Sequence, residues 1–336
     1  MSTQANTPTA TFLSKEEFDT YKGGQNAALR LTACLWGFLV LLLVGLNWAI
    51  GTGNWLIQVP AGMLVFVLVG WVQASLSNGF HEAVHYNFGE HHSDRLSLAL
   101  LGYPTFFTLN YRTVHMQHHR YFGDPENDPD FKTFSGFPRT RGEFLKRLIF
   151  MGSGIAAAHQ LLTKNLKPQK KLSRSAKSGK GKSRSDLVGL AMTQLVILGL
   201  YTWILGPIFY LFFWVLPLGT IGKLAKSTRA FCEHGSPDRD WVLRTITGTP
   251  LQTGTLGMYG FHFHGEHHLY PWVPYPKLEA LYLRHQRELE DPEYVSERGS
   301  EYESFDGGYF RLLWKWFQEL PWQAPSRELD ETVSAV

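Results

Sequence analysis

Two long apolar segments without charged side chains dominate the hydropathy pattern of the chain. Residues 31–80 contain no Asp, Glu, Lys or Arg, and neither do residues 187–222. As one helix the first segment would be about 75 Å long, more than twice the hydrocarbon core of a bilayer, so it must fold back. The sequences at 51–54 (Gly-Thr-Gly-Asn) and 206–207 (Gly-Pro) break each segment. The pattern predicts an all-α integral membrane protein whose four transmembrane helices form two hairpins, near residues 31–50, 55–76, 187–205 and 207–222.

The predicted topology places most of the polar chain in one compartment. Two hairpins return the chain to its starting side, and the three segments on that side hold all fourteen histidines. The turns on the other side carry no Lys or Arg, so the positive-inside rule predicts that both termini and the histidines are cytoplasmic. We therefore expect a cytosolic N-terminal segment (1–30), a membrane domain (31–285) and a cytosolic C-terminal tail (286–336).

Several polar or interrupted segments complete this outline. Leu96–Leu109 and Phe144–Leu162 are apolar but too short or too polar for confident spans, so they are either interfacial or re-entrant elements or packing helices of a cytosolic cap. The aromatic run from Phe310 to Phe317 is expected to pack on this cap or on the membrane surface. Although the formal net charge is only +3, nine Lys or Arg and no acid lie between Lys164 and Arg184. Because this basic loop (164–186) is rich in Ser and Gly, it indicates a solvated cytosolic loop and no nucleic-acid partner.

Three histidine clusters carry the candidate chemistry. They read HEAVH at 81–85, HMQHH at 115–119 and HGEHH at 264–268, and on a helix such spacings place the imidazoles on one face. The chain has only two cysteines, which argues against a thiolate site. Eight imidazoles exceed the four ligands of a single Zn²⁺, so the clusters predict a pair of first-row metals with open positions. Iron is the obvious candidate, since imidazole suits it and it activates O₂.

These residues resemble the membrane fatty acid desaturase and hydroxylase superfamily, which has an HxxxH box, an HxxHH box and a later HxxHH box after a second membrane hairpin. The resemblance covers about residues 30–285 and extends to HHRYFGDPENDPDF and GEHHLYPWVPYPKL. It implies a helical cap in which two irons, with O₂ as co-substrate, are ligated by the box histidines, and it suggests His234, just after the last span, as a ninth ligand. The implied ligands are His81, His85, His115, His118, His119, His234, His264, His267 and His268.

Other polar residues near the clusters have less certain roles. His91 and His92 either orient ligands or lie on the surface, and His159, His262 and His285 are expected to be packing or surface residues. Acidic residues close to the boxes can hold an imidazole N–H and so orient the ring. The candidates are Glu82, Glu233, Glu266, Asp124 and Asp130, although turn formation beside proline is a competing role for Asp124 and Asp128.

The resemblance implies O₂-dependent desaturation of a fatty acyl chain linked to a lipid, CoA or a carrier protein. The substrate would enter from the bilayer. Because the chain lacks a Gly-rich dinucleotide fingerprint, electrons must come from outside, and the resemblance implies a ferredoxin or cytochrome b5-type donor. Hydroxylation or ketolation of a lipid, a carotenoid or an alkane remains an alternative. A remote alternative is a membrane zinc metalloprotease, since HEAVH also matches HExxH with Glu82 as general base, but it would leave both HxxHH boxes without a role.

Overall fold

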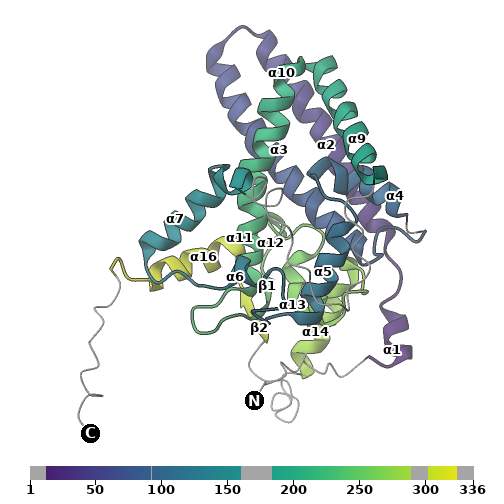
Figure 1. Cartoon of the computed structure of the whole chain (residues 1–336), viewed down its shortest axis with the longest axis vertical. Coiled ribbons are helices and arrows are strands. Elements are labelled where there is room, and N and C mark those ends of the chain that lie inside the picture. The colour runs from purple at the N-terminus through teal and green to yellow at the C-terminus, as the bar shows by residue number, and fades with distance from the viewer. Residues whose placement is uncertain (1–12, 92, 160–183, 289–301, 324–336) are drawn as a thin grey trace.

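The computed structural model describes residues 13–91, 93–159, 184–288 and 302–323, so all but the last three residues of the basic loop lie outside the described residues. The chain is mostly helical. Long helices form one part of the molecule, and shorter helices with one pair of strands form a cap at their lower end (Figure 1).

Four helices are long and apolar enough to cross a membrane, as the hydropathy pattern predicts. They are α2 (Asn26–Gly51), α3 (Trp55–Val84), α9 (Arg184–Ile204) and a continuous helix, Pro207–His234, which comprises α10 (Pro207–Tyr210), η3 (Leu211–Val215), η4 (Leu218–Gly222) and α11 (Lys223–His234). Gly53 adopts a φ of 67° between α2 and α3, and the Asn54 side chain caps α3 by accepting the Leu56 N–H (3.0 Å). Gly206, with a φ of 114°, ends the second apolar segment's first helix directly before Pro207.

Two of these helices extend from the bundle into the cap. The predicted spans end near residues 76 and 222, whereas α3 continues to Val84 and the Pro207–His234 helix continues to His234. The two helices approach closely at Gly70 and Gly222: a Cβ at Gly70 would lie 2.5 Å from Cβ of Ile221. Nearer the cap, Nη1 of Arg229 donates to Oδ1 of Asn78 (2.8 Å). The ends of both helices are therefore held together, and they carry His81 and His234.

The cap is built around short elements with buried inner faces. Its helices include α5 (Asn110–Tyr121), α6 (Phe131–Phe134), α12 (Pro250–Gly254), α13 (His264–Leu269) and α14 (Leu278–Glu288), with 3-10 turns η5 (Phe261–Phe263) and η6 (Tyr275–Lys277). Strands β1 (Leu243–Thr247) and β2 (Tyr302–Asp306) pair in parallel, with Leu243 opposite Tyr302. This small sheet is a detail that the all-α prediction lacks, because five-residue strands leave little trace in the hydropathy pattern.

The C-terminal part of the described chain is folded into the cap. Helix α16 (Gly308–Glu319) packs its buried residues against Phe144 and Phe231, and β2 is paired with β1. Residues 302–319 thus pack on the cap, which is one of the two positions expected for the aromatic run Phe310–Phe317. The outer side chains of α16 remain exposed.

The interrupted apolar segments take two different positions. Within Leu96–Leu109, short turns pack against the bundle: η1 (Leu98–Gly102) lies on α3 and η2 (Tyr103–Thr105) on α9, following α4 (Asp94–Ser97). In contrast, α7 (Arg141–Gly152) extends sideways beside α16, and Nε of Arg141 donates to the Phe317 carbonyl (2.9 Å) (Figure 1). The short helix α1 (Lys15–Thr20) precedes α2 at the opposite side of the cap.

Candidate metal centre

Four elements bring the nine predicted ligand histidines together at the junction of bundle and cap. Helix α3 and its C-cap carry His81 and His85, α5 carries the second box, α11 ends at His234, and α13 carries the third box. Seven of the nine are buried, whereas His119 and His268 are half-buried. Two of the four elements are extensions of the long bundle helices, so the site is positioned by rigid structure.

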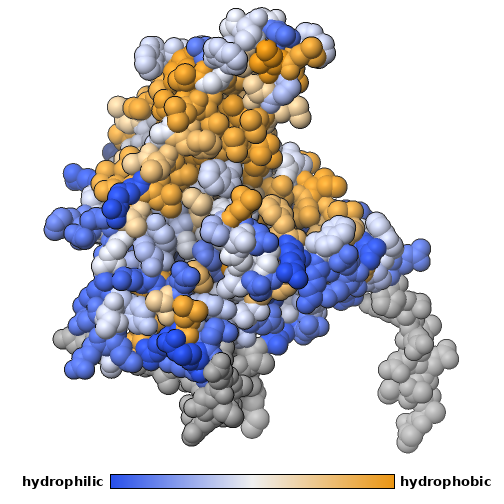
Figure 2. Space-filling model, turned by 180° about the vertical axis from the view of Figure 1, so that it is seen from behind, coloured by the Kyte–Doolittle hydropathy of each residue, from blue (hydrophilic) through white to orange (hydrophobic). Residues whose placement is uncertain are grey.

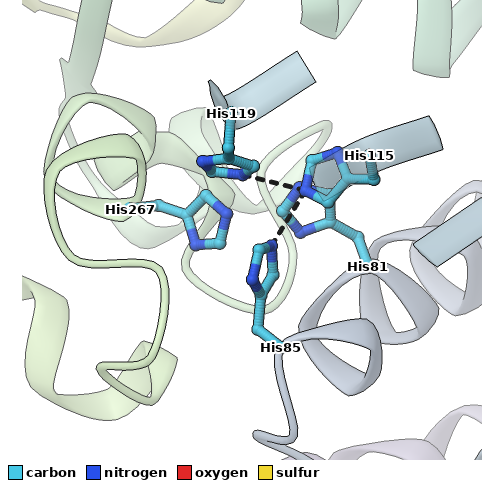
Figure 3. Close-up of side chains that lie close together, drawn as sticks. All are labelled: His81, His85, His115, His119 and His267. Atoms are coloured by element: carbon cyan, nitrogen blue, oxygen red, sulfur yellow. Dashed lines mark hydrogen bonds between the residues drawn. The ribbon is translucent and has the colours of Figure 1, made fainter. Parts of the chain in front are cut away.

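Five imidazoles form a first group, shown in Figure 3, with their rings directed toward one another. One ligand atom from each lies within 4.8 Å of those of the others. At its centre, Nε2 of His115 is 2.9 Å from Nε2 of His85 and 2.9 Å from Nε2 of His119. The members are His81, His85, His115, His119 and His267.

The remaining four predicted ligands form a second group. His118, His234 and His268 offer ring nitrogens within 4.8 Å of one another. His264 joins them, because its Nε2 is 3.0 Å from Nε2 of His234 and 3.1 Å from Nε2 of His268. The second and third boxes are therefore each divided between the two groups.

Hydrogen bonding alone does not account for these contacts. A neutral imidazole nitrogen presents either one N–H or one lone pair, and so makes one well-directed hydrogen bond. Nε2 of His115 and Nε2 of His264 each face two other imidazole nitrogens. Two nitrogens about 2.1 Å from one ion and at right angles to each other would be about 3.0 Å apart, which is the spacing observed. The donor set fits two metal ions, one in each group.

Burial keeps the imidazoles in the neutral form that binds metals. Loss of solvation lowers the pKa of His85 to about 3. The same effect, together with repulsion between neighbouring imidazoles, holds the pKa of five further ligands well below its usual value: His115, His119, His264, His267 and His268. At neutral pH each of these rings offers a lone pair.

In the first group, two rings have nitrogens that nothing else satisfies. Among the described residues no hydrogen-bond partner reaches either ring nitrogen of His81 or of His267, and all four atoms are buried. The nearest carboxylate is that of Glu82, whose Oε1 is 3.6 Å from Nδ1 of His267 and 4.0 Å from Nδ1 of His81. Buried polar atoms without partners are costly, so these two rings also fit a role in binding metal.

In the second group, the far side of two rings is held by the protein. Oδ1 of Asp128 lies 2.8 Å from Nδ1 of His118, and the other oxygen of Asp128 accepts the Gly123 N–H (3.1 Å). Nδ1 of His234 lies 3.2 Å from the Val242 carbonyl and donates to it, because a carbonyl can only accept. These bonds leave Nε2 of each ring toward the group, the usual arrangement for metal-binding histidines.

Two predicted orienting acids are anchored by tyrosines that sequence reasoning missed. Oε1 of Glu233 accepts the Tyr309 hydroxyl (2.9 Å), while its Oε2 is 3.7 Å from Nε2 of His264. Oε1 of Glu266 accepts the Tyr302 hydroxyl (2.5 Å). Both tyrosines come from the C-terminal segment, and nothing in their local sequence indicates this role.

The other polar candidates lie away from the two groups or shape nearby turns. Asp124 accepts the backbone N–H groups of Glu126 and Asn127, and the backbone N–H of Asp130 donates to Asp128. Among the predicted turn formers it is thus Asp128 that holds an imidazole. The remaining histidines are distributed as follows: His91 and His159 are exposed, His262 faces the Gly257 carbonyl, His285 is buried against Glu266, and His92 lies outside the described residues.

The arrangement defines a class of protein: a helical membrane protein with two adjoining clusters of imidazoles that can bind metal. In agreement, the family model described as fatty acid desaturase matches residues 53–299, and the chain belongs to this family. The chain is also similar to a dihydrorhizobitoxine desaturase from Bradyrhizobium elkanii, with 29% identity over 256 residues that cover 69% of each chain. Membership of this family indicates an oxidoreductase.

Proposed function

We propose that the protein is a di-iron enzyme that introduces a carbon–carbon double bond into a fatty acyl chain linked to a lipid, CoA or a carrier protein. The observation that carries the proposal is the pair of nitrogen clusters centred on His115 and His264, each of which fits one ion. Family membership supports iron and an acyl substrate. The relative's name supports desaturation, although the substrate that it names is dihydrorhizobitoxine.

The nine histidines would hold the two irons, five in the first group and four in the second. Bound iron would supply the oxidative chemistry, in which O₂, two electrons and two protons convert –CH₂–CH₂– into –CH=CH– and two water molecules. Asp128 and the Val242 carbonyl orient the rings of His118 and His234. Burial of the clusters excludes water, which limits side reactions at the oxidising centre.

The irons would be reduced by an external ferredoxin or cytochrome b5-type protein, since the sequence contains no dinucleotide fingerprint of its own. His119 and His268, one from each group, are the half-buried members of the set. Of the nine histidines these two are therefore the most accessible from solvent, and the donor is expected to approach on their side.

We also propose that the four apolar helices cross the membrane as two hairpins, with the histidines and both termini in the cytoplasm. Figure 2 shows the apolar surface concentrated on the bundle and the polar surface on the cap. A second apolar patch lies beside the bundle at the level where its apolar surface ends. Exposed apolar side chains on α7 and α16 also suit the surface of a bilayer, and they include Ile149, Phe150, Phe310 and Trp314.

The function is tested with purified protein in lipid nanodiscs that is supplied with substrate acyl chains, a reduced donor and ¹⁸O₂. Metal analysis should find about two irons per chain, and the product should be an unlabelled olefin with the label in water only. Label in the organic product would establish hydroxylation or ketolation instead. About one zinc per chain would establish the metalloprotease alternative, which the grouping of HEAVH with three further imidazoles already opposes.

A further inference from the structure

The C-terminal segment of the described chain reaches back to the metal centre. Strand β2 pairs in register with β1, which packs against α13, the helix of the third histidine box, and α16 packs on α11. The family model ends at residue 299, so this segment lies beyond the region that it matches. The segment nevertheless places two tyrosine hydroxyls on two buried carboxylates beside the predicted ligands.

The first of these contacts anchors the third box. Glu266 lies between the predicted ligands His264 and His267 and is completely buried. Its Oε1 accepts the Tyr302 hydroxyl (2.5 Å), and its Oε2 accepts the Thr245 hydroxyl. Nδ1 of His285 lies 3.3 Å from Oε1 as a third partner. A buried carboxylate needs such partners, because burying it without them is strongly unfavourable. Tyr302 and Thr245 therefore hold the side chain of Glu266, and through it the short helix α13.

The glycine of HGEHH is explained by the same contact. A Cβ at Gly265 would lie 2.5 Å from the ring of Tyr302 and 2.9 Å from Oγ1 of Thr245. Real Cβ atoms essentially never make contacts this short with a fixed ring, so a side chain here would displace β2 from α13. Only glycine at position 265 leaves room for the ring of Tyr302.

The second contact anchors the end of α11. Glu233 is completely buried next to His234, and its Oε1 accepts the hydroxyl of Tyr309, which is also completely buried. Oε2 of Glu233 is 3.4 Å from Nε of Arg229 and 3.7 Å from Nε2 of His264. Tyr309 fixes one oxygen of this carboxylate and so directs the other toward Arg229 and the second group.

We infer that Tyr302 and Tyr309 are positioning residues that brace the metal centre through Glu266 and Glu233. This inference rests on the proposed function, since it assumes that the histidines bind iron. It adds a role for residues 302–309, which act on the ligands through α13 and α11 without touching them. Groups that support metal ligands from outside typically change metal affinity about 10–100-fold when removed.

The test compares Tyr302→Phe, Tyr309→Phe and the double variant with wild type in nanodiscs. Each substitution removes one hydroxyl and keeps the ring, so the packing of the cap should persist. Iron per chain, the rate of iron loss to an excess of chelator and the Mössbauer spectrum are measured. We expect each single variant to lose iron about 10-fold faster and to show an altered spectrum, with a larger effect in the double variant.

Tyr201→Phe is the matched control, because the buried Tyr201 hydroxyl donates to the Phe213 carbonyl among the bundle helices (2.7 Å) and not to a carboxylate of the cap. It should retain iron like wild type. Glu266→Gln serves as a second variant of the brace, and it should lose iron at least as fast as Tyr302→Phe. Wild-type retention and spectra in all three tyrosine variants of the brace would overturn the inference. If wild type itself bound no iron, the proposed function would fail instead, so the two failures are distinguishable.

Discussion

His115 and His264 hold equivalent places in the two imidazole groups. The Nε2 atom of each lies 2.9–3.1 Å from two neighbouring imidazoles. One neighbour is four residues further along the same helix, and the other comes from a different element. Removing either ring should therefore open one metal position while leaving most ligands of the other intact. Each group can therefore be tested with a substitution of its own.

His115→Ala and His264→Ala should each lower the iron content from about two per chain to about one or less and abolish turnover. The physical reason is that each substitution removes the imidazole whose Nε2 lies next to two other imidazole nitrogens of its group. Inductively coupled plasma mass spectrometry of the purified variants measures this directly. His159→Ala, which changes an exposed histidine, should keep the full content. Two irons per chain in both cluster variants would refute the ligand assignment.

Asp128→Asn should weaken iron retention about 10-fold, because it removes the negative charge beside Nδ1 of His118. An amide has only one accepting oxygen, so it cannot accept from both His118 and the Gly123 N–H as the two carboxylate oxygens do. Iron loss to a chelator, followed over time, gives the ratio of rates. Asp124→Asn is the control in the same turn, since Asp124 bonds to backbone N–H groups and to Asn127. Equal rates for both variants would mean that the Asp128 contact does not support a ligand.

At the scale of elements, the site depends on how α3 meets the Pro207–His234 helix. Both helices end at the candidate metal centre, and they touch where Gly70 faces Ile221 and Gly222. A small change at this crossing is therefore expected to move His81 relative to His234. The crossing lies inside the bundle, about three helical turns before His81 on α3 and before His234 on the other helix.

Gly70→Ala should destabilise the protein by about 1–3 kcal/mol, the usual cost of overpacking, and should also reduce iron content. The added Cβ would lie 2.5 Å from Cβ of Ile221, so the helices must separate. Thermal unfolding in detergent measures the stability, and metal analysis measures the second effect. Gly45→Ala on α2 meets nothing within 4 Å and should leave both unchanged or slightly improved. If the Gly70→Ala protein were as stable as the Gly45→Ala protein, the two helices would not be in close contact at Gly70.

At the scale of the whole molecule, α7 and α16 form a side platform next to the bundle. The exposed face of α16 is divided, with Phe310 and Trp314 on one stripe and Arg311 and Lys315 on another. Helices of this kind lie in the bilayer interface with the apolar stripe toward the acyl chains. The platform would then keep the cap at a constant height below the bilayer.

Spin labels can test this placement in a Cys34→Ala background, because the second cysteine, Cys232, is buried. A label on Phe310→Cys should collide with O₂, which concentrates in the bilayer, more than with a soluble nickel chelate. A label on Lys315→Cys, five residues along the same helix, should show the opposite preference. Greater nickel accessibility at both positions would place the platform in water.

Much of this protein follows from local sequence. The uncharged blocks determine four apolar helices, since their backbone groups can be satisfied only within helices in a lipid environment. The three boxes contain eight histidines, more than one metal ion needs. The sequence in and around these boxes indicates the family to which the chain belongs. Helical periodicity and composition act over a few residues, so they can be read directly from the chain.

Only the tertiary structure decided how those histidines are shared and supported. One helix presents His115, His118 and His119 on a common face, yet only His115 and His119 meet the histidines at the end of α3. His118 instead meets His234 at the end of α11. Asp128 and not its neighbours holds an imidazole, and Tyr302 and Tyr309 reach carboxylates 36 and 76 residues away. Such contacts depend on packing between distant segments, and no short-range pattern in the sequence records which segments will meet.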